Sequence, residues 1–269
     1  METQRYRVHA DAVVMWEGNQ ILFGRPSQGG VCRSLLVLVL VLPLLATTVE
    51  AQGPDFTSLF DGSSLDGWEG NHQLFLVVDG SIVGGTLDAR IPADEFLCTA
   101  EEFEDFELRL EARMTPGQIG GVQFRGQRVP GSTQVAGYQA DMGFVPGIWI
   151  PRLSDMKGVD PEEAYPLWGS LLDEYRPERS RYPDPAAPYR LIAVADRKVV
   201  DPVLKPGDWN SLSITAVDSL IEIRLNGTKT VDYLEREDVP RTGVICVQIH
   251  SGPPAQASYR NILIRRIAG

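Results

Sequence analysis

The chain has 269 residues, of which 43% are apolar, and a formal net charge of −11. This length and composition are those of a globular protein with one large domain or two small ones. The acidic balance and the lack of any Lys/Arg-rich run argue against a nucleic-acid partner.

The N-terminal segment has the layout of a secretory signal. Arg33 precedes an apolar run over 35–46, and the small-residue pattern Val49-Glu50-Ala51 follows it. We expect cleavage after Ala51, so that 1–51 is an N-terminal extension and signal and 52–269 is an exported, periplasmic or extracellular domain. The run is shorter than the roughly 20 residues of a membrane span, so no stable span is expected after cleavage. A retained N-terminal anchor is the alternative.

The next elements are short candidate strands joined by tight turns. "FLVVDGSIVGG" (75–85) predicts a hairpin around Asp79-Gly80. In "FELRLEAR" (106–113) apolar and charged residues alternate with a period of two, which is typical of a strand with one wet face. "GGVQFRG" (120–126) and "GYQADMG" (137–143) are bounded by Gly and also predict strands.

Residues 142–190 interrupt this pattern, because they are rich in Pro, Asp, Arg and aromatic residues and show little periodicity. So long a segment without regular structure is typical of a binding loop or lid. An elaborated surface loop without such a role is the alternative. After it, 209–233 indicates three strands, the last two joined at Asn226-Gly227, and strands at 243–252 and 258–267 complete the chain. Many short alternating strands predict an all-β sandwich or jelly roll.

Export would remove Cys32 and leave Cys98 and Cys246 in the mature chain. Two thiols in an oxidising compartment can form one disulfide, and two buried free thiols are the alternative.

Three candidate strands share a polar pattern, with an amide and an ionisable group at alternate positions and apolar residues between them. Alternate side chains of a strand point to the same face. If the strands lie in one sheet, its outer face gathers groups that hydrogen-bond sugar hydroxyls and move protons. An ordinary solvated face is the alternative. The pairs are Gln123 with Arg125, Gln139 with Asp141, and Gln248 with His250.

The segment "WGSLLDEYR" (168–176) adds further candidates, and we expect it to fold over the same face from the long loop. It supplies Asp173, Glu174 and Arg176 as polar groups. Its aromatic residues are Trp168 and Tyr175. Together with Trp149 they could stack on pyranose rings, although Trp in β proteins is more often in the core.

Several motifs occur together in a familiar order. They are "LFDGSSLDGWEG", "EFEDFELRLEARMTPG", "GGVQFRG", "GYQADMG", "WGSLLDEYR", "GDWNSLSI", "LNGTKTVDY" and the closing "YRNILIRRI". Over about 57–267 the chain resembles a large bacterial family described as 3-keto-disaccharide hydrolases, 3-keto-glucoside lyases and 2-hydroxy-glucal hydratases. The resemblance implies a concanavalin A-like (laminarinase/lectin-like) jelly-roll fold and an exported protein. Many members carry an acidic residue after the Tyr of the "GY" motif, where this chain has Gln139, so the identity of the base stays open.

The chemistry that the resemblance implies is glycoside cleavage by elimination and hydration. A ketone at C3 acidifies the proton on C2, a base removes it, the enolate expels the group at C1, and water then adds. Such a site needs a base, a donor for the enolate oxygen and an acid for the leaving group.

We assign each role on this basis. The base is Asp141 or His250, the enolate stabiliser Arg125, and the acid Glu174 or Asp173. A divalent metal on Asp141, Glu174 and His250 could replace Arg125, and no other cofactor is expected. The residues that would position the substrate are Gln123, Gln139, Gln248, Trp168, Tyr175 and Arg176.

Two functions from different classes follow. The first is an exported enzyme acting on 3-keto-glycosides. The second is a non-catalytic carbohydrate-binding module on the same scaffold, since a jelly roll does not choose between them. Clustered ionisable groups favour the enzyme.

Overall fold

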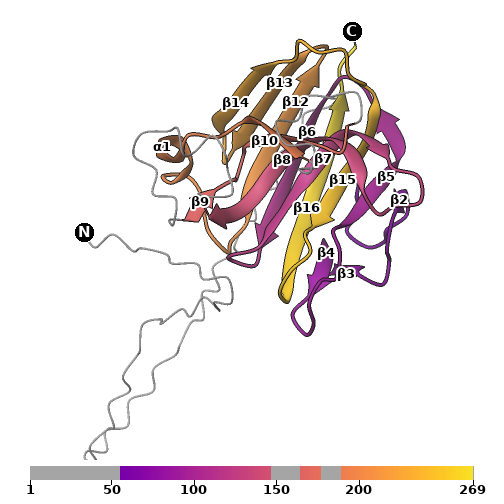
Figure 1. Ribbon diagram of the computed structural model, residues 1–269. Coiled ribbons are helices and arrows are strands. Elements are labelled where there is room, and N and C mark those ends of the chain that lie inside the picture. The colour runs from indigo at the N-terminus through magenta and orange to yellow at the C-terminus, as the bar shows by residue number, and fades with distance from the viewer. Residues whose placement is uncertain (1–54, 147–163, 177–188, 269) are drawn as a thin grey trace, which may run out of the picture.

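The computed structural model describes residues 55–146, 164–176 and 189–268. The expected signal region, 1–51, and Trp149 lie outside them. Within the described residues two antiparallel sheets of eight strands each pack face to face, which confirms the predicted all-β sandwich (Figure 1). A four-residue helix, α1 (Arg197–Val200), precedes the strands of 210–234. No helix in the described ranges has the length and apolarity to cross a membrane.

The first sheet has the order β14-β13-β12-β6-β16-β4-β3, with β1 beside β16. Its strands alternate buried and exposed residues, so one face packs into the sandwich and the other meets solvent. The strands are β1 (Thr57–Ser58), β3 (Phe75–Val78), β4 (Ser81–Thr86), β6 (Phe106–Met114), β12 (Asn210–Val217), β13 (Leu220–Leu225), β14 (Thr228–Leu234) and β16 (Ala255–Arg266).

The second sheet has the order β11-β10-β8-β7-β15-β5-β2, with β9 beside β8. Its inner face supplies Val122, Phe124, Tyr138, Ala140 and Val247 to the core shared with the first sheet, as their alternation with polar residues predicts. The strands are β2 (Trp68–Glu69), β5 (Glu95–Phe103), β7 (Ile119–Arg128), β8 (Val135–Pro146), β9 (Ala164–Pro166), β10 (Leu171–Glu174), β11 (Tyr189–Ala193) and β15 (Gly243–Ile249).

The two predicted tight hairpins are confirmed. Asn226 and Gly227 join β13 to β14 with φ of 48° and 80°, and Asp79 and Gly80 join β3 to β4 with φ of 49° and 71°. Positive φ at both central residues is what a type I′ turn requires, and Asn, Asp and Gly adopt it at low cost.

The prediction of a loop through 142–190 is wrong in part, because β10 is a sheet strand paired with β8 and β11. All four β10 residues are buried, including the acidic ones. Asp173 faces the interior, where its carboxylate meets Arg176 Nε at 2.6 Å. An inward carboxylate removes the apolar–polar alternation by which the other strands are visible in the sequence.

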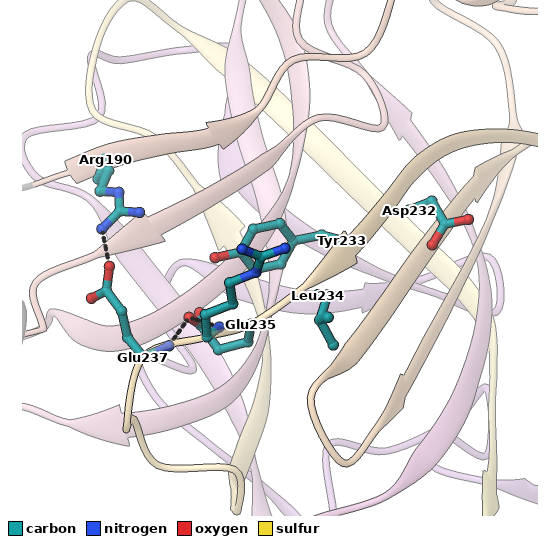
Figure 2. A pocket seen from close by; sticks show the side chains of 7 residues that line it. Arg190, Asp232, Tyr233, Leu234, Glu235 and Glu237 are labelled. Atoms are coloured by element: carbon teal, nitrogen blue, oxygen red, sulfur yellow. Dashed lines mark hydrogen bonds and ion pairs between the residues drawn. The ribbon is translucent and has the colours of Figure 1, made fainter.

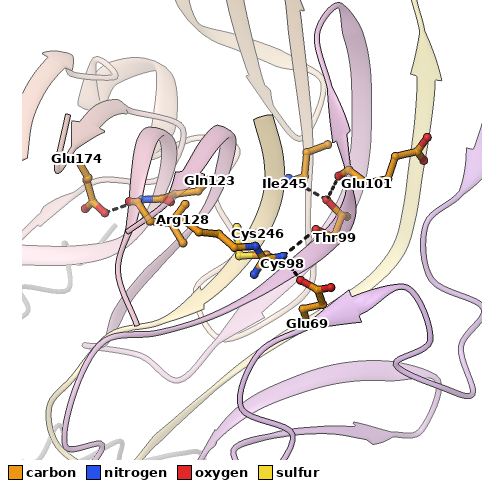
Figure 3. The surroundings of a disulfide bond; sticks show 10 residues. Glu69, Cys98, Thr99, Glu101, Gln123, Arg128, Glu174, Ile245 and Cys246 are labelled. Carbon is orange, nitrogen blue, oxygen red and sulfur yellow. Dashed lines mark hydrogen bonds and ion pairs between the residues drawn. A yellow bond between two sulfur atoms is a disulfide. The ribbon is translucent and has the colours of Figure 1, made fainter. Parts of the chain in front are cut away.

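Cys98 on β5 and Cys246 on β15 form a disulfide. The two residues are direct cross-strand partners, and Cys246 also lies opposite Gln123 of β7. With Phe96, Val135 and Val244 they make an apolar cluster separate from the main core. The disulfide therefore lies on the outer face of the second sheet, next to the amide of Gln123 (Figure 3).

Candidate active site

A pair of buried carboxyl groups lies on the outer face of the second sheet. Strand β8 supplies Asp141 and Gln139, β10 supplies Glu174, and β7 supplies Gln123, which lies directly opposite Gln139. Gln123 Nε2 donates to Glu174 Oε2 at 2.8 Å, and Gln139 Nε2 lies 3.5 Å from Glu174 Oε1. Figure 3 shows the contact of Gln123 with Glu174. Antiparallel register thus brings these predicted residues together.

Both carboxyl groups favour the protonated form. Asp141 is 1% exposed and Glu174 9%. Burial raises the pKa of Glu174 to about 8, and the charges of Asp94 and Asp173 also raise it. The hydrogen bond from Gln123 acts in the opposite direction and lowers this pKa. Burial raises the pKa of Asp141 well above its ordinary value, and the Glu174 carboxylate raises it further. Burial and a like charge both disfavour the anion.

The two carboxyls have different hydrogen-bond partners and act on each other's ionisation. A strong amide hydrogen bond stabilises the Glu174 anion, and that anion in turn holds the proton on Asp141. The Asp141 carboxyl accepts from the Met142 backbone N–H at 2.8 Å. The arrangement therefore offers Glu174, a carboxyl whose pKa of about 8 lies near neutral pH, beside a second buried carboxyl, Asp141, whose pKa is also raised.

Three glutamines face the same side of the sheet and carry unused acceptors. In the described part of the chain, the Oε1 atoms of Gln123, Gln139 and Gln248 are buried without a hydrogen-bond partner. A buried carbonyl oxygen without a partner is costly, and such groups occur where a ligand or water completes the site. Each oxygen can accept a hydrogen bond from a hydroxyl group, which suits a sugar ligand.

Gly121 on β7 makes room for this arrangement. A Cβ at Gly121 would lie 2.5 Å from the Gln139 side chain. We expect Gly121→Ala to displace the amide that touches both carboxyls and to lower kcat about tenfold, because small misplacement of a positioning group is costly. Steady-state kinetics and thermal unfolding would measure this. Unchanged kcat in Gly121→Ala would contradict a role for the Gln139 position.

The prediction that Arg125 shares the polar face is wrong. The register of β7 and β8 shifts between Phe124 and Gln127, and Arg125 has a φ of 51°. Its guanidinium instead joins the connection between β5 and β6, where it meets Asp105 Oδ1 at 3.0 Å, to the β12–β13 turn, where it meets the Asp218 carbonyl at 2.8 Å. A β-bulge redirects a side chain in this way.

Asp173 and Arg176 also lie away from the carboxyl pair. Besides their ion pair, the Arg176 guanidinium lies 4.5 Å from the centre of the Tyr138 ring, on the inner side of the sheet. Tyr138 Oη in turn meets Glu235 Oε2 at 2.5 Å. The predicted roles of Asp173 as acid and Arg176 as a sugar ligand are therefore wrong.

The two aromatic candidates in the described residues lie in different surroundings. Trp168 is 2% exposed and belongs to the core, so its predicted stacking on a sugar is wrong. Tyr175 is half-buried with a φ of 53°, and burial, Asp94 and Glu174 raise its pKa. Tyr175 therefore lies near the carboxyl pair.

His250 lies at the edge of the site beside a residue that the sequence did not point to. Its Nδ1 is 2.7 Å from the Ser251 carbonyl oxygen and 3.5 Å from Asp94 Oδ1. Asp94 directly precedes β5 in a segment without a motif, and only the fold brings it here. Among the described residues no three His, Cys, Asp or Glu side chains are grouped to hold a metal, so Asp141, Glu174 and His250 do not fit the metal set expected of them.

Two hollows lie on the described surface. One of about 300 Å³ borders the disulfide and is lined by Phe96, Arg128 and Val135 among others. The Val135 carbonyl accepts from the same Gln123 Nε2 that binds Glu174, so this hollow adjoins the carboxyl pair. The other, about 410 Å³, lies at 232–237 beside Arg190, and none of its lining residues belongs to the pair (Figure 2).

Solved structures share this fold. Two crystal structures of candidate glycosyl hydrolases from Parabacteroides distasonis ATCC 8503 match the chain. The first has 17% identity and a TM-score of 0.55, covering 80% of this chain and 94% of that one. The second has 19% identity and a TM-score of 0.51, covering 79% and 100%. No curated protein matches significantly.

The two-sheet jelly-roll fold together with the family match supports a carbohydrate-active protein. The chain belongs to the family of 3-keto-alpha-glucoside-1,2-lyase-like domains, whose model matches residues 55–265. This match confirms the resemblance found in the sequence motifs.

Proposed function

We propose that the chain is an exported enzyme that cleaves 3-keto-glycosides by elimination at C1 followed by hydration. The observation that carries the proposal is the buried pair of Asp141 and Glu174 with Gln139 against both carboxyls. Family membership supports the substrate class. The N-terminal sequence pattern supports export.

In this proposal Glu174 is the base and Asp141 the acid. Glu174 removes the C2 proton, and the electron pair moves toward the C3 carbonyl to form an enolate. The enolate then expels the group at C1, and Asp141 gives its proton to the leaving oxygen. A base is most effective when its pKa lies near the working pH, as that of Glu174 does. Both groups are buried, so substrate reaches them only after the side chains over them move.

The donor for the enolate oxygen has to differ from the one expected from the sequence. Arg125 is held by the β5–β6 connection and the β12–β13 turn and faces away from the pair. We assign this role to the amide of Gln248, which lies on the same face of the sheet.

A non-catalytic sugar-binding module is the second candidate. The unpartnered glutamine oxygens would serve it equally well. However, a binder has no use for two buried carboxyls that raise the free energy of the folded state, whereas a proton-transfer site does. The carboxyl pair therefore favours the enzyme.

The test is turnover of a chromogenic 3-keto-glucoside by the purified full-length chain, with the unoxidised glucoside as control and with EDTA in parallel. We expect release from the keto form alone, unaffected by EDTA. No release from either form by folded protein would favour the binding module. EDTA-sensitive release would contradict the metal-free assignment of roles.

A further inference from the structure

The contacts of His250 define which of its two ring nitrogens donates a hydrogen bond. Its Nδ1 lies 2.7 Å from the Ser251 carbonyl oxygen, and a carbonyl oxygen only accepts hydrogen bonds. Nδ1 therefore carries a proton, and Nε2 is the ring nitrogen that is left to exchange a proton with a water molecule. The side chain is 35% exposed, in contrast to the buried Asp141 and Glu174. His250 thus lies where solvent meets the site.

Asp94 holds this arrangement together from the start of β5. Its Oδ1 accepts from the Ser251 backbone N–H at 2.7 Å and lies 3.5 Å from His250 Nδ1. Its backbone carbonyl accepts from Thr133 Oγ1 at 3.0 Å, which fixes the β7–β8 hairpin. The same carboxylate acts on Glu174 and Tyr175, whose pKa values it raises. Asp94 therefore contacts the segment of His250 and acts electrostatically on Glu174.

We propose that Asp94 is a positioning residue that orients His250 as the base for the attacking water, so that the two half-reactions use two different bases. This inference rests on the proposed function. Glu174 removes the C2 proton in the buried part of the site. His250 Nε2 removes a proton from the attacking water at the exposed edge of the site.

The water step adds a hydroxyl group to C1 and a proton to C2. The water oxygen bonds to C1 of the enone while His250 Nε2 takes one of its protons. The C1=C2 electron pair moves to C2–C3, and the carbonyl pair moves onto the C3 oxygen. C2 then recovers the proton held by Glu174, and the C3 ketone reforms. The imidazolium, which faces the Asp94 carboxylate, returns its proton through solvent to Asp141, replacing the one given to the leaving group.

The experiment measures the two half-reactions separately, each at the pH optimum of the variant. Leaving-group release uses a chromogenic 3-keto-glucoside, and hydration uses the isolated 3-keto-2-hydroxy-glucal. We expect His250→Ala to slow hydration about 10²-fold or more and Asp94→Asn to slow it about tenfold, because a positioned base contributes roughly 10²–10⁴-fold. Leaving-group release should stay within about threefold in both. Asp94→Asn keeps an oxygen that can accept from Ser251, so the fold should persist.

Two controls match the chemical changes. Asp61→Asn removes a carboxylate that likewise accepts from backbone N–H groups, in a turn of 61–64. His72→Ala removes an exposed imidazole. Both should leave the two rates unchanged.

A readout independent of activity is the ¹⁵N spectrum of His250 in the full chain. We expect the Nδ1–H tautomer in the wild type and a mixture of tautomers in Asp94→Asn. Unchanged hydration in His250→Ala, or equal losses in both half-reactions, would overturn the water step alone. A wild-type Nε2–H tautomer would overturn it as well. A wild type that processes neither compound would overturn the proposed function, and the water step with it.

Discussion

Glu174→Gln and Asp141→Asn should each lower turnover of a 3-keto-glucoside by about 10²–10⁴-fold, the contribution of one positioned proton-transfer group. Glutamine and asparagine keep the shape and the hydrogen-bonding oxygen of the carboxyls but cannot exchange a proton. Each variant removes one member of the pair that the Gln139 amide touches.

The measurement is single-turnover release from the chromogenic keto-glucoside, with folding checked by thermal unfolding. Glu102→Gln, an exposed carboxylate on β5, is the matched control and should retain full activity. Full turnover by Glu174→Gln would exclude Glu174 as the base.

The free energy of unfolding should fall as the pH rises from about 4.5 to about 8. Glu174 has an ordinary pKa of 4.5 and a folded-state pKa of about 8. Between these values the unfolded chain releases the proton while the folded chain retains it, so rising pH favours unfolding. At about 1.36 kcal/mol per pKa unit, this loss amounts to roughly 4 kcal/mol. Asp141 acts in the same direction, because its pKa is also raised.

Denaturant unfolding at several pH values, with the disulfide intact, measures this dependence. Glu174→Gln should flatten the curve over the same range and make the protein more stable than the wild type at pH 8. If both proteins show the same slope, the Glu174 carboxyl is not protonated at neutral pH. That result would remove the physical basis for its role as a base.

The sequence alone determined the strands whose side chains alternate, the two hairpins and the shared face of Gln123, Gln139 and Asp141. These features depend on a period of two and on turn residues that accept positive φ, both of which are local properties. The motifs distributed along the chain likewise identified the family before any contact was known.

The tertiary structure decided which of these groups meet. Strand β10 pairs with β8 and thereby brings Glu174 within a side-chain hydrogen bond of Gln123, 51 positions away in the sequence, which no local pattern specifies. A β-bulge in β7 directs the Arg125 side chain away from the polar face. Asp173 points into the sandwich, where it forms an ion pair with Arg176. Asp94 reaches Ser251 only because β5 and β15 are neighbours in the sheet. Cross-strand register and bulges depend on the packing of the whole sandwich, and for this reason the proton-transfer pair and its positioning residue appear only in the folded chain.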